Sequence, residues 1–508
     1  MNFFKNVILL LIIASTLVLN ACSSVSKPDK KPNVLWIVLE DTAPLMGCYG
    51  TEIISTPNID NLAKEGLTFT NAIMPAPVCS ASRSSMITGV MSTTFGGHNH
   101  HSARTKESAI YLPEYMKTIP ELFKDAGYFT FNNGKDDYNF TYNRSDLYTQ
   151  KHRAHPLYGK GGVRIPLDSL SSKTPFFGQI QLDGGKEIFN GNFEGRVKTP
   201  VDRSLIKLPP YLPNNPVIIE EYANHLDAIQ ITDEILGNII EKLKENGLLE
   251  NTIVFFFSDH GMRLTRHKQF LYEGGIKVPL IIADFTKSKI TKSGEVFEGL
   301  VSGIDFGPSS LALAGIAIPE YIEGQDFLSK GAKEREYVIS TRDRCDFTID
   351  RIRSVRSKDF KYIKNFMLDR PYTQPTYMDV DGIAFVKTMN ELNRDNKLDS
   401  IQKIFFAKDR ISEELYDLKN DPYEIHNLAL DPKYASELKK HADILENWIK
   451  ETDDKGQYPE NEENLKLMLG IWGDNATNPE FDALKVKYPD LAGSQFWLKS
   501  EHWGAIEN

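Results

Sequence analysis

Two pairs of polar residues follow apolar runs that read as buried strands. Glu40 and Asp41 follow residues 33–39, and Asp259 and His260 follow residues 253–257 after one serine. Adjacent carboxylates at a strand end repel each other unless a cation lies between them. Several carboxylate oxygens with one imidazole suit Ca²⁺, or alternatively Mg²⁺, better than Zn²⁺. The four residues together predict such a metal site, although either pair alone is compatible with an ordinary loop.

A third candidate is Cys79, which stands at the start of a predicted helix, with Arg83 four residues later. A helix N-terminus and a nearby cation both lower the pKa of a thiol, and both also bind anions. Taken alone, the two residues are compatible with a reactive cysteine or with a buried structural one.

These groups require elements that bring them to one edge of a sheet. Apolar runs predict strands over residues 33–39, 128–131, 253–257 and 278–283. Helices are expected over residues 57–65, 120–126 and 218–246, each followed by glycine. This alternation predicts an open α/β sheet with helices on both faces, and ligands gather beyond the carboxyl ends of strands in such sheets.

The pattern changes near residue 336. A strand over 337–340, a hairpin over 354–365 and a helix over 434–450 predict a smaller α+β domain with an antiparallel sheet. A chain of 508 residues is too long for one ordinary domain. We therefore predict a catalytic domain over residues 33–335 and a second domain over residues 336–508.

The first 22 residues resemble the signal peptide of a bacterial lipoprotein. Lys5 precedes an apolar stretch too short to span a membrane, and Ala21 precedes Cys22. The resemblance implies that Cys22 is lipidated, that residues 23–32 form a tether, and that the protein is anchored to a bacterial membrane. We expect the outer membrane, at its periplasmic or cell-surface face. An ordinary secretory peptide cut nearby is the alternative.

The net charge of -10 limits the partners of this chain. An acidic surface repels nucleic acids, so no nucleic-acid partner is expected. An anionic substrate requires cations gathered locally at the site. Two further cysteines, Cys48 and Cys345, do not reveal from sequence whether they form a disulfide.

The segment from Pro77 to Gly89 (PVCSASRSSMITG) resembles the signature of type I sulfatases, Cys-x-Ala-x-Arg with its usual extension. In that family a maturase oxidises the cysteine to formylglycine, and the hydrated aldehyde is the nucleophile. Similar blocks occur in family order around Glu40-Asp41, Gly134-Lys135, residues 251–261 and residues 414–428. The resemblance extends over residues 31–450 and implies an alkaline-phosphatase-like fold: an open, mostly parallel sheet flanked by helices.

The resemblance also implies roles for individual residues. The metal ligands would be Glu40, Asp41, modified Cys79, Asp259 and His260. Arg83 would hold the aldehyde hydrate, and Lys135 and Lys268 would stabilise charge on the sulfate. Three segments resemble the heparan N-sulfatase-like branch: Glu40-Asp41, Gly134-Lys135-Asp136 and Arg342-Asp343-Arg344. We expect Arg342 or Arg344 to contact a uronic acid or a second sulfate. A solvated charge run is the alternative for these arginines.

The sequence departs from the family pattern where two histidines are common. The position two residues after Lys135 is Asp137, and the segment after residues 176–182 reads Asp-Gly-Gly-Lys. We expect His100 to be the acid for the leaving group, with His98, His101 and Lys268 as alternatives.

These features predict a sulfatase that hydrolyses sulfate esters or N-sulfates of a sulfated polysaccharide or oligosaccharide, such as ulvan or heparan. One alternative is a phosphoryl or phosphonate hydrolase of the same superfamily. Another is a non-catalytic glycan-binding lipoprotein, against which the intact set of Cys79, Arg83, Lys135 and metal-ligand candidates argues.

Overall fold

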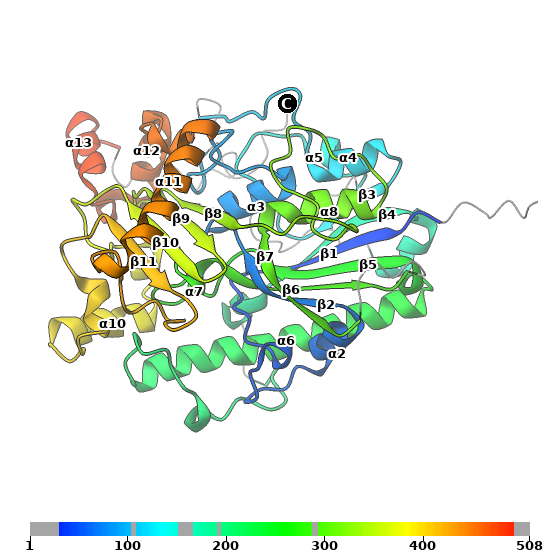
Figure 1. Cartoon of the computed structure of the whole chain (residues 1–508), viewed down its shortest axis with the longest axis horizontal. Coiled ribbons are helices and arrows are strands. Elements are labelled where there is room, and N and C mark those ends of the chain that lie inside the picture. The colour runs from blue at the N-terminus through cyan, green and yellow to red at the C-terminus, as the bar shows by residue number, and fades with distance from the viewer. Residues whose placement is uncertain (1–29, 103–107, 151–165, 190–194, 287–292, 492–508) are drawn as a thin grey trace, which may run out of the picture.

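The computed structural model describes residues 30–102, 108–150, 166–189, 195–286 and 293–491, and its main element is a seven-stranded sheet (Figure 1). In order across the sheet, the strands are β3 (Phe129–Asn133), β4 (Phe176–Leu182), β1 (Asn33–Leu39), β5 (Thr252–Ser258), β6 (Lys277–Asp284), β2 (Leu67–Ile73) and β7 (Glu295–Ser302). Only β6 runs antiparallel to its neighbours. The predicted open, mostly parallel sheet is confirmed.

Helices cover both faces of this sheet because its central strands are apolar on both sides. Trp36 and its alternate neighbours in β1 pack in one core with α3 (Cys79–Thr88), α4 (Ile119–Asp125) and α8 (Phe306–Leu313). Ile37 and its alternate neighbours pack in a second core with α2 (Pro57–Glu65) and α6 (Pro216–Glu245). Figure 1 shows α3 and α8 above the sheet and α2 and α6 below it.

A smaller antiparallel sheet follows, in the order β11 (Glu413–Asp417), β10 (Phe360–Asn365), β9 (Ile352–Ser357) and β8 (Tyr337–Arg342). Helix α11 (Ala435–Thr452) packs on it through Leu445, which shares a core with Val355 and Tyr362. Shorter helices complete this part of the chain: α9 (Tyr377–Val380), α10 (Ala384–Arg394), α12 (Glu462–Trp472) and α13 (Pro479–Lys487). The predicted antiparallel hairpin and packed helix are both present.

The two sheets share a core, in which Ile73 and Leu300 of the large sheet meet Val338 and Ile352 of the small one. The domain boundary at residue 335 stays a prediction. Cys22 and the predicted signal peptide lie outside the described residues. Of the helices in the described ranges, none combines the length and apolar character needed to cross a bilayer.

Candidate active site

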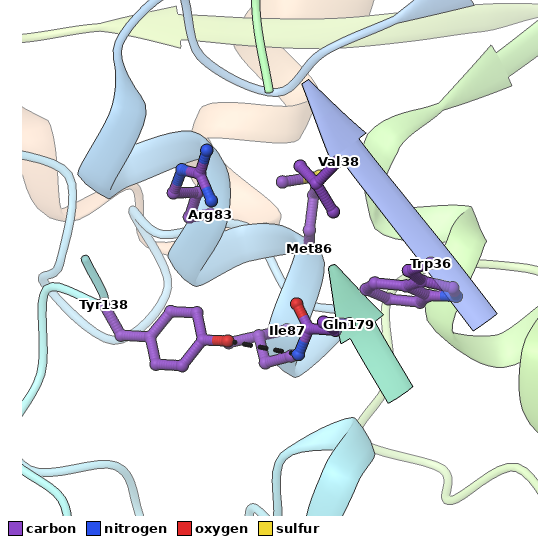
Figure 2. Close-up of a pocket in the computed structure, with 7 residues that line it drawn as sticks. All are labelled: Trp36, Val38, Arg83, Met86, Ile87, Tyr138 and Gln179. Carbon is purple, nitrogen blue, oxygen red and sulfur yellow. Dashed lines mark hydrogen bonds between the residues drawn. The ribbon is translucent and has the colours of Figure 1, made fainter. Parts of the chain in front are cut away.

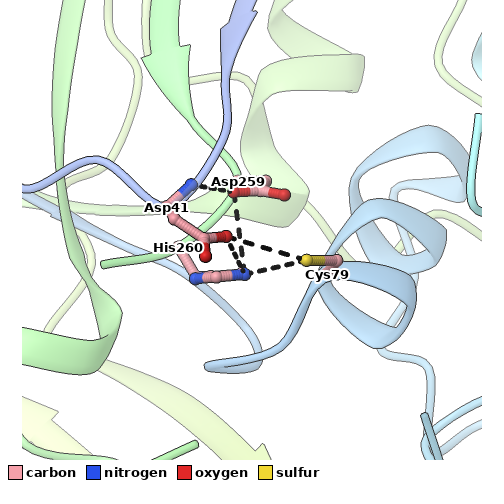
Figure 3. Close-up of side chains that lie close together, drawn as sticks. All are labelled: Asp41, Cys79, Asp259 and His260. Atoms are coloured by element: carbon pink, nitrogen blue, oxygen red, sulfur yellow. Dashed lines mark hydrogen bonds and ion pairs between the residues drawn. The ribbon is translucent and has the colours of Figure 1, made fainter. Parts of the chain in front are cut away.

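The carboxyl ends of β1 and β5 and the start of α3 meet at one point. Ligand atoms of Asp41, Cys79, Asp259 and His260 all lie within 4.8 Å of one another, and all four residues are buried (Figure 3). The Asp41 N–H donates to Asp259 Oδ1 (3.1 Å), which ties the two strand ends together. His260 Nδ1 contacts the Gly261 carbonyl (2.9 Å), so Nε2 points toward the group and lies 3.1 Å from Cys79 Sγ.

These donors fit a divalent cation. Two carboxylates and an imidazole converge with the Cys79 sulfur, and the carboxylate oxygens are the ligands among them that hard cations prefer. Burial alone would raise the pKa of Asp259, but the charges of His260 and Arg83 lower it well below the usual range. The carboxylate is therefore ionised and available as a ligand at neutral pH.

Helix α3 presents Cys79 at its first turn and is buried along its whole length. Its small side chains allow close approach to β5, since Ser82 Oγ donates to the Asp259 carbonyl (2.6 Å). Arg83 Nε donates to Asp259 Oδ2 (3.0 Å), and Arg83 Nη1 donates to Gln181 Oε1 (2.7 Å). Below Arg83, α3, β1 and β4 enclose a small pocket, in which Gln179 is the β4 residue and Tyr138 also contributes to the lining (Figure 2). The guanidinium is thus fixed one helical turn after Cys79.

Three ammonium groups surround the Cys79 sulfur. Lys268 Nζ lies 3.6 Å from Sγ and Lys186 Nζ lies 3.9 Å from it. Burial would raise the pKa of the thiol, but Lys135, Lys186 and Lys268 outweigh that effect and lower the pKa to about 7. The pKa of each lysine is itself raised by nearby anions despite burial. The site is therefore strongly electropositive, as a reaction that develops negative charge requires.

Lys186 is absent from the sequence prediction. It lies on the segment after β4, and its Nζ contacts Glu40 Oε2 (2.5 Å) and Asp41 Oδ1 (3.6 Å). A signal was available, because the segment follows the carboxyl end of a strand beside β1. The family commonly has a histidine in this segment, and here Lys186 supplies the cation.

Glu40 has a different environment from the other predicted metal ligands. Its carboxylate contacts Lys186 and lies 3.3 Å from Lys135 Nζ, and it is not a member of the group of four. Burial raises its pKa, but Lys135, Lys186 and Arg83 lower it overall. Its role as a metal ligand stays a prediction, and in this structure it holds the lysines.

The two adjacent histidines of the loop after α3 differ. His100 is buried, its Nδ1 lies 2.7 Å from Ser80 Oγ, and burial lowers its pKa well below the usual range. His101 stacks on His100, and its ring nitrogens lie 3.4 Å from carboxylate oxygens of Asp137 and Asp346. Asp137, at the position where the family commonly has histidine, also lies 3.4 Å from Lys135 Nζ. His101 is therefore linked to the lysine cluster.

The two arginines predicted to bind substrate are buried and paired within the protein. Arg342 Nη1 contacts Asp350 Oδ2. Arg344 donates to both carboxylate oxygens of Glu460 (2.6 and 2.7 Å). Their contact with substrate stays a prediction, and in this structure both arginines serve internal ion pairs.

Comparisons with known proteins agree with this geometry. The model of the family described as "Sulfatase" matches residues 32–316, more than half of the chain. The chain belongs to the sulfatase family. A second model, "N-sulphoglucosamine sulphohydrolase, C-terminal", matches residues 260–403 of this sulfatase. The protein is a sulfuric ester hydrolase.

Relatives of this sulfatase include an "Ulvan-active sulfatase" of Formosa agariphila, 31% identical over 91% of this chain and 81% of that protein. The human "N-sulphoglucosamine sulphohydrolase" is 26% identical over 87% of this chain and 93% of its own length. A solved structure described as a 2-O GAG sulfatase superposes with a TM-score of 0.62 at 22% identity, covering 85% of this chain and 94% of that one. The predicted alkaline-phosphatase-like sulfatase fold is confirmed.

Proposed function

We propose that this sulfatase removes sulfate groups from an ulvan-type sulfated polysaccharide, with Cys79 as the nucleophile after oxidation to formylglycine by a maturase. The observation that carries the proposal is the convergence of three ammonium groups on Cys79 beside a metal-ligand set. The ulvan-active relative supports the substrate class, since it shares more identity with this chain than the human relative does.

The chain's own residues would bind and orient the sulfate group. Lys135, Lys186 and Lys268 would hold its oxygens and stabilise the charge that grows there in the transition state. Arg83 Nη2 is a buried donor that makes no hydrogen bond to the part of the chain that is described, so it could bind an oxygen on modified residue 79. A bound divalent cation, Ca²⁺ with Mg²⁺ as the alternative, would supply Lewis-acid assistance.

His101 is our choice for the acid that protonates the leaving group, in place of His100. The buried, neutral His100 holds Ser80, whereas the side chain of His101 is 18% exposed with a carboxylate facing each ring nitrogen. Such acceptors can hold a proton on both nitrogens, so one proton can be passed to a sugar oxygen. Asp137 would position His101 beside Lys135.

The acid can be tested with leaving groups of different basicity. His101→Asn should lower kcat on a sugar sulfate by about 10²–10⁴-fold while hardly changing turnover of nitrophenyl sulfate, whose leaving group needs no proton. His100→Asn is the matched control and should affect both substrates equally. Equal losses on both substrates for His101→Asn would assign that residue a structural role.

The overall proposal is tested by measuring inorganic sulfate released from ulvan oligosaccharides, with heparan fragments in parallel. Nitrophenyl sulfate and nitrophenyl phosphate separate a sulfatase from a phosphoryl hydrolase of the same superfamily. We expect sulfate release from ulvan fragments and a clear preference for the aryl sulfate. Preferred turnover of the aryl phosphate, or glycan binding without turnover, would contradict the proposal.

We further propose that Cys22 is lipidated and anchors the enzyme to the outer membrane, on the strength of its position after an apolar stretch and Ala21. Labelled palmitate should enter the wild-type protein and not the Cys22→Ser variant. Equal labelling of the two proteins would contradict lipidation at this position.

A further inference from the structure

A second pocket, of about 180 Å³, lies between the loop after α3 and the segment before α12. His98 and Asn99 line it from the loop, and Tyr458, Glu460 and Asn464 line it from the C-terminal segment. None of these residues belongs to the cluster around Cys79, so the pocket is a separate feature of the surface.

Two buried polar atoms of this pocket make no hydrogen bond within the described ranges, His98 Nδ1 and Asn464 Oδ1. His98 is only 7% exposed and Asn464 only 5% exposed. A buried polar group without a partner costs about 1–3 kcal/mol, and such groups are rare in native proteins. Two of them on one pocket therefore point to a ligand.

The hydrogen-bond network assigns the position of the proton on the His98 ring. Asn99 Oδ1 accepts from the Arg344 N–H (3.1 Å), which assigns the other end of the amide as nitrogen. That nitrogen lies 3.4 Å from His98 Nε2, which must accept, so the ring proton stands on Nδ1. Burial lowers the pKa of His98 and keeps the ring neutral. The pocket thus offers one assigned donor, His98 Nδ1–H, and the side-chain amide of Asn464, which can both donate and accept.

The charged groups around this pocket are already neutralised. Glu460 accepts two hydrogen bonds from Arg344, and Lys455 Nζ contacts Asp453. A sulfate or carboxylate would bring a negative charge into the pocket without gaining an unpaired cation among its described lining residues. A hydroxyl both donates and accepts, and it matches the pair.

An aromatic ring stands at the mouth of the pocket. Tyr458 is 54% exposed, and its hydroxyl donates to Asp453 Oδ1 (2.6 Å), which fixes the ring. An exposed and fixed aromatic face packs against the apolar face of a sugar ring at low entropic cost.

The pocket is connected to the nucleophile through consecutive contacts. Arg344, which holds Glu460, accepts from the His100 N–H (2.9 Å) and donates to the His100 carbonyl (2.9 Å). His100 in turn contacts Ser80, the neighbour of Cys79. These contacts fix the position of the pocket relative to Cys79.

We propose that this pocket is a subsite for an unsulfated sugar residue of the polysaccharide, held by His98, Asn464 and Tyr458 away from the residue that is desulfated. The proposal rests on the polysaccharide substrate proposed above. It assigns the enzyme a preference for oligosaccharides over single sulfated sugars.

Tyr458→Ala and Asn464→Leu test the subsite. Each should raise KM for a sulfated ulvan oligosaccharide by about tenfold while kcat stays within about twofold. The kcat/KM for nitrophenyl sulfate, which is too small to reach the pocket, should not change. Tyr115→Ala removes another exposed tyrosine, whose ring packs near Tyr321, and should leave both substrates unaffected.

Equal losses of kcat/KM on both substrates would mean that the substitution disturbs the structure. Unchanged KM values for the oligosaccharide would contradict the subsite. Calorimetry with desulfated ulvan oligosaccharides tests the subsite independently of the proposal that the enzyme removes sulfate from ulvan. If wild type binds the neutral oligosaccharide and Tyr458→Ala does not, the subsite stands even where no sulfate is released. Absence of binding to wild type would overturn it.

Discussion

Two regions of this protein bury many charges, and they differ in how those charges are paired. Around β8 and β9, Arg353 donates to both carboxylate oxygens of Asp454 (2.8 and 2.9 Å) and to Asp343 (3.1 Å), and Arg410 donates to Asp350 (2.7 Å). Around Cys79, by contrast, three lysines converge on one sulfur and on carboxylates that also face a metal position.

The contrast separates stability from catalysis. Closed ion pairs satisfy each other, and removal of one member leaves a buried charge without a partner. Charges that converge on one reactive atom can still interact with the charge that develops on a substrate. This electrostatic preorganisation is usually a large contribution to catalysis. Mutations in the first region should therefore reduce stability, and those in the second should reduce turnover.

The largest effect is expected at the centre of the converging charges. Cys79→Ala removes the nucleophile and should lower kcat by about 10⁴-fold or more with little change in Tm, as measured by sulfate release and calorimetry. Cys48→Ala, at a half-buried cysteine outside the site, is the control. Retained turnover in Cys79→Ala would contradict the proposed chemistry.

The next largest effect is expected when the metal is removed, because only the site around Cys79 would lose a bound ion. Chelation should abolish turnover and lower Tm, because a cation bound at 100 times its Kd stabilises the folded state by about 2.7 kcal/mol. Added Ca²⁺ or Mg²⁺ should restore both properties, and Asp259→Asn should lose this response. An unchanged Tm and unchanged turnover after chelation would mean that Asp41, Asp259 and His260 hold no cation.

The paired region should show the reverse behaviour. Arg353→Met leaves Asp454 and Asp343 buried without their partner and should cost about 3–5 kcal/mol of stability. Enzyme that remains folded at low temperature should keep its kcat. Arg394→Met, at an exposed arginine, is the control for loss of a charge. A fall in kcat without a fall in Tm would place Arg353 in the catalytic machinery.

The sequence predicted much of the fold and the centre of the site. Continuous apolar runs correctly located β1 and β5. Of the polar pairs after them, Asp41, Asp259 and His260 meet at Cys79, whereas Glu40 pairs with lysines. The edge strand β7 was not predicted, because it mixes exposed charges with buried apolar residues and lacks a continuous run. Arg342 and Arg344 could be interpreted in two ways, since only the fold supplies Asp350 and Glu460 as partners.

A smaller effect is expected from a buried histidine beside the segment that follows β1. His225 Nε2 faces the Ala43 N–H (3.4 Å), and burial lowers the pKa of His225 to about 4. The unfolded chain binds a proton below pH ~6.5 that the folded protein excludes, so this stability is present above pH ~6.5 and is lost as pH falls toward 4.

At pH 5 the loss should be about 2 kcal/mol relative to pH 7. Chemical denaturation at the two values should show it, and His225→Gln should reduce the difference. An identical pH dependence in the variant would show that other groups control stability in this range.

The proposed chemistry requires that Cys79 becomes the nucleophile by oxidation to formylglycine. Its most direct test is expression with a formylglycine-generating maturase, followed by trypsin digestion and mass measurement of the peptide from Glu65 to Arg83. We expect the mass of a peptide with an aldehyde in place of the thiol, and no such peptide from Cys79→Ala. An unmodified thiol, in cells that convert a known sulfatase, would contradict the claim.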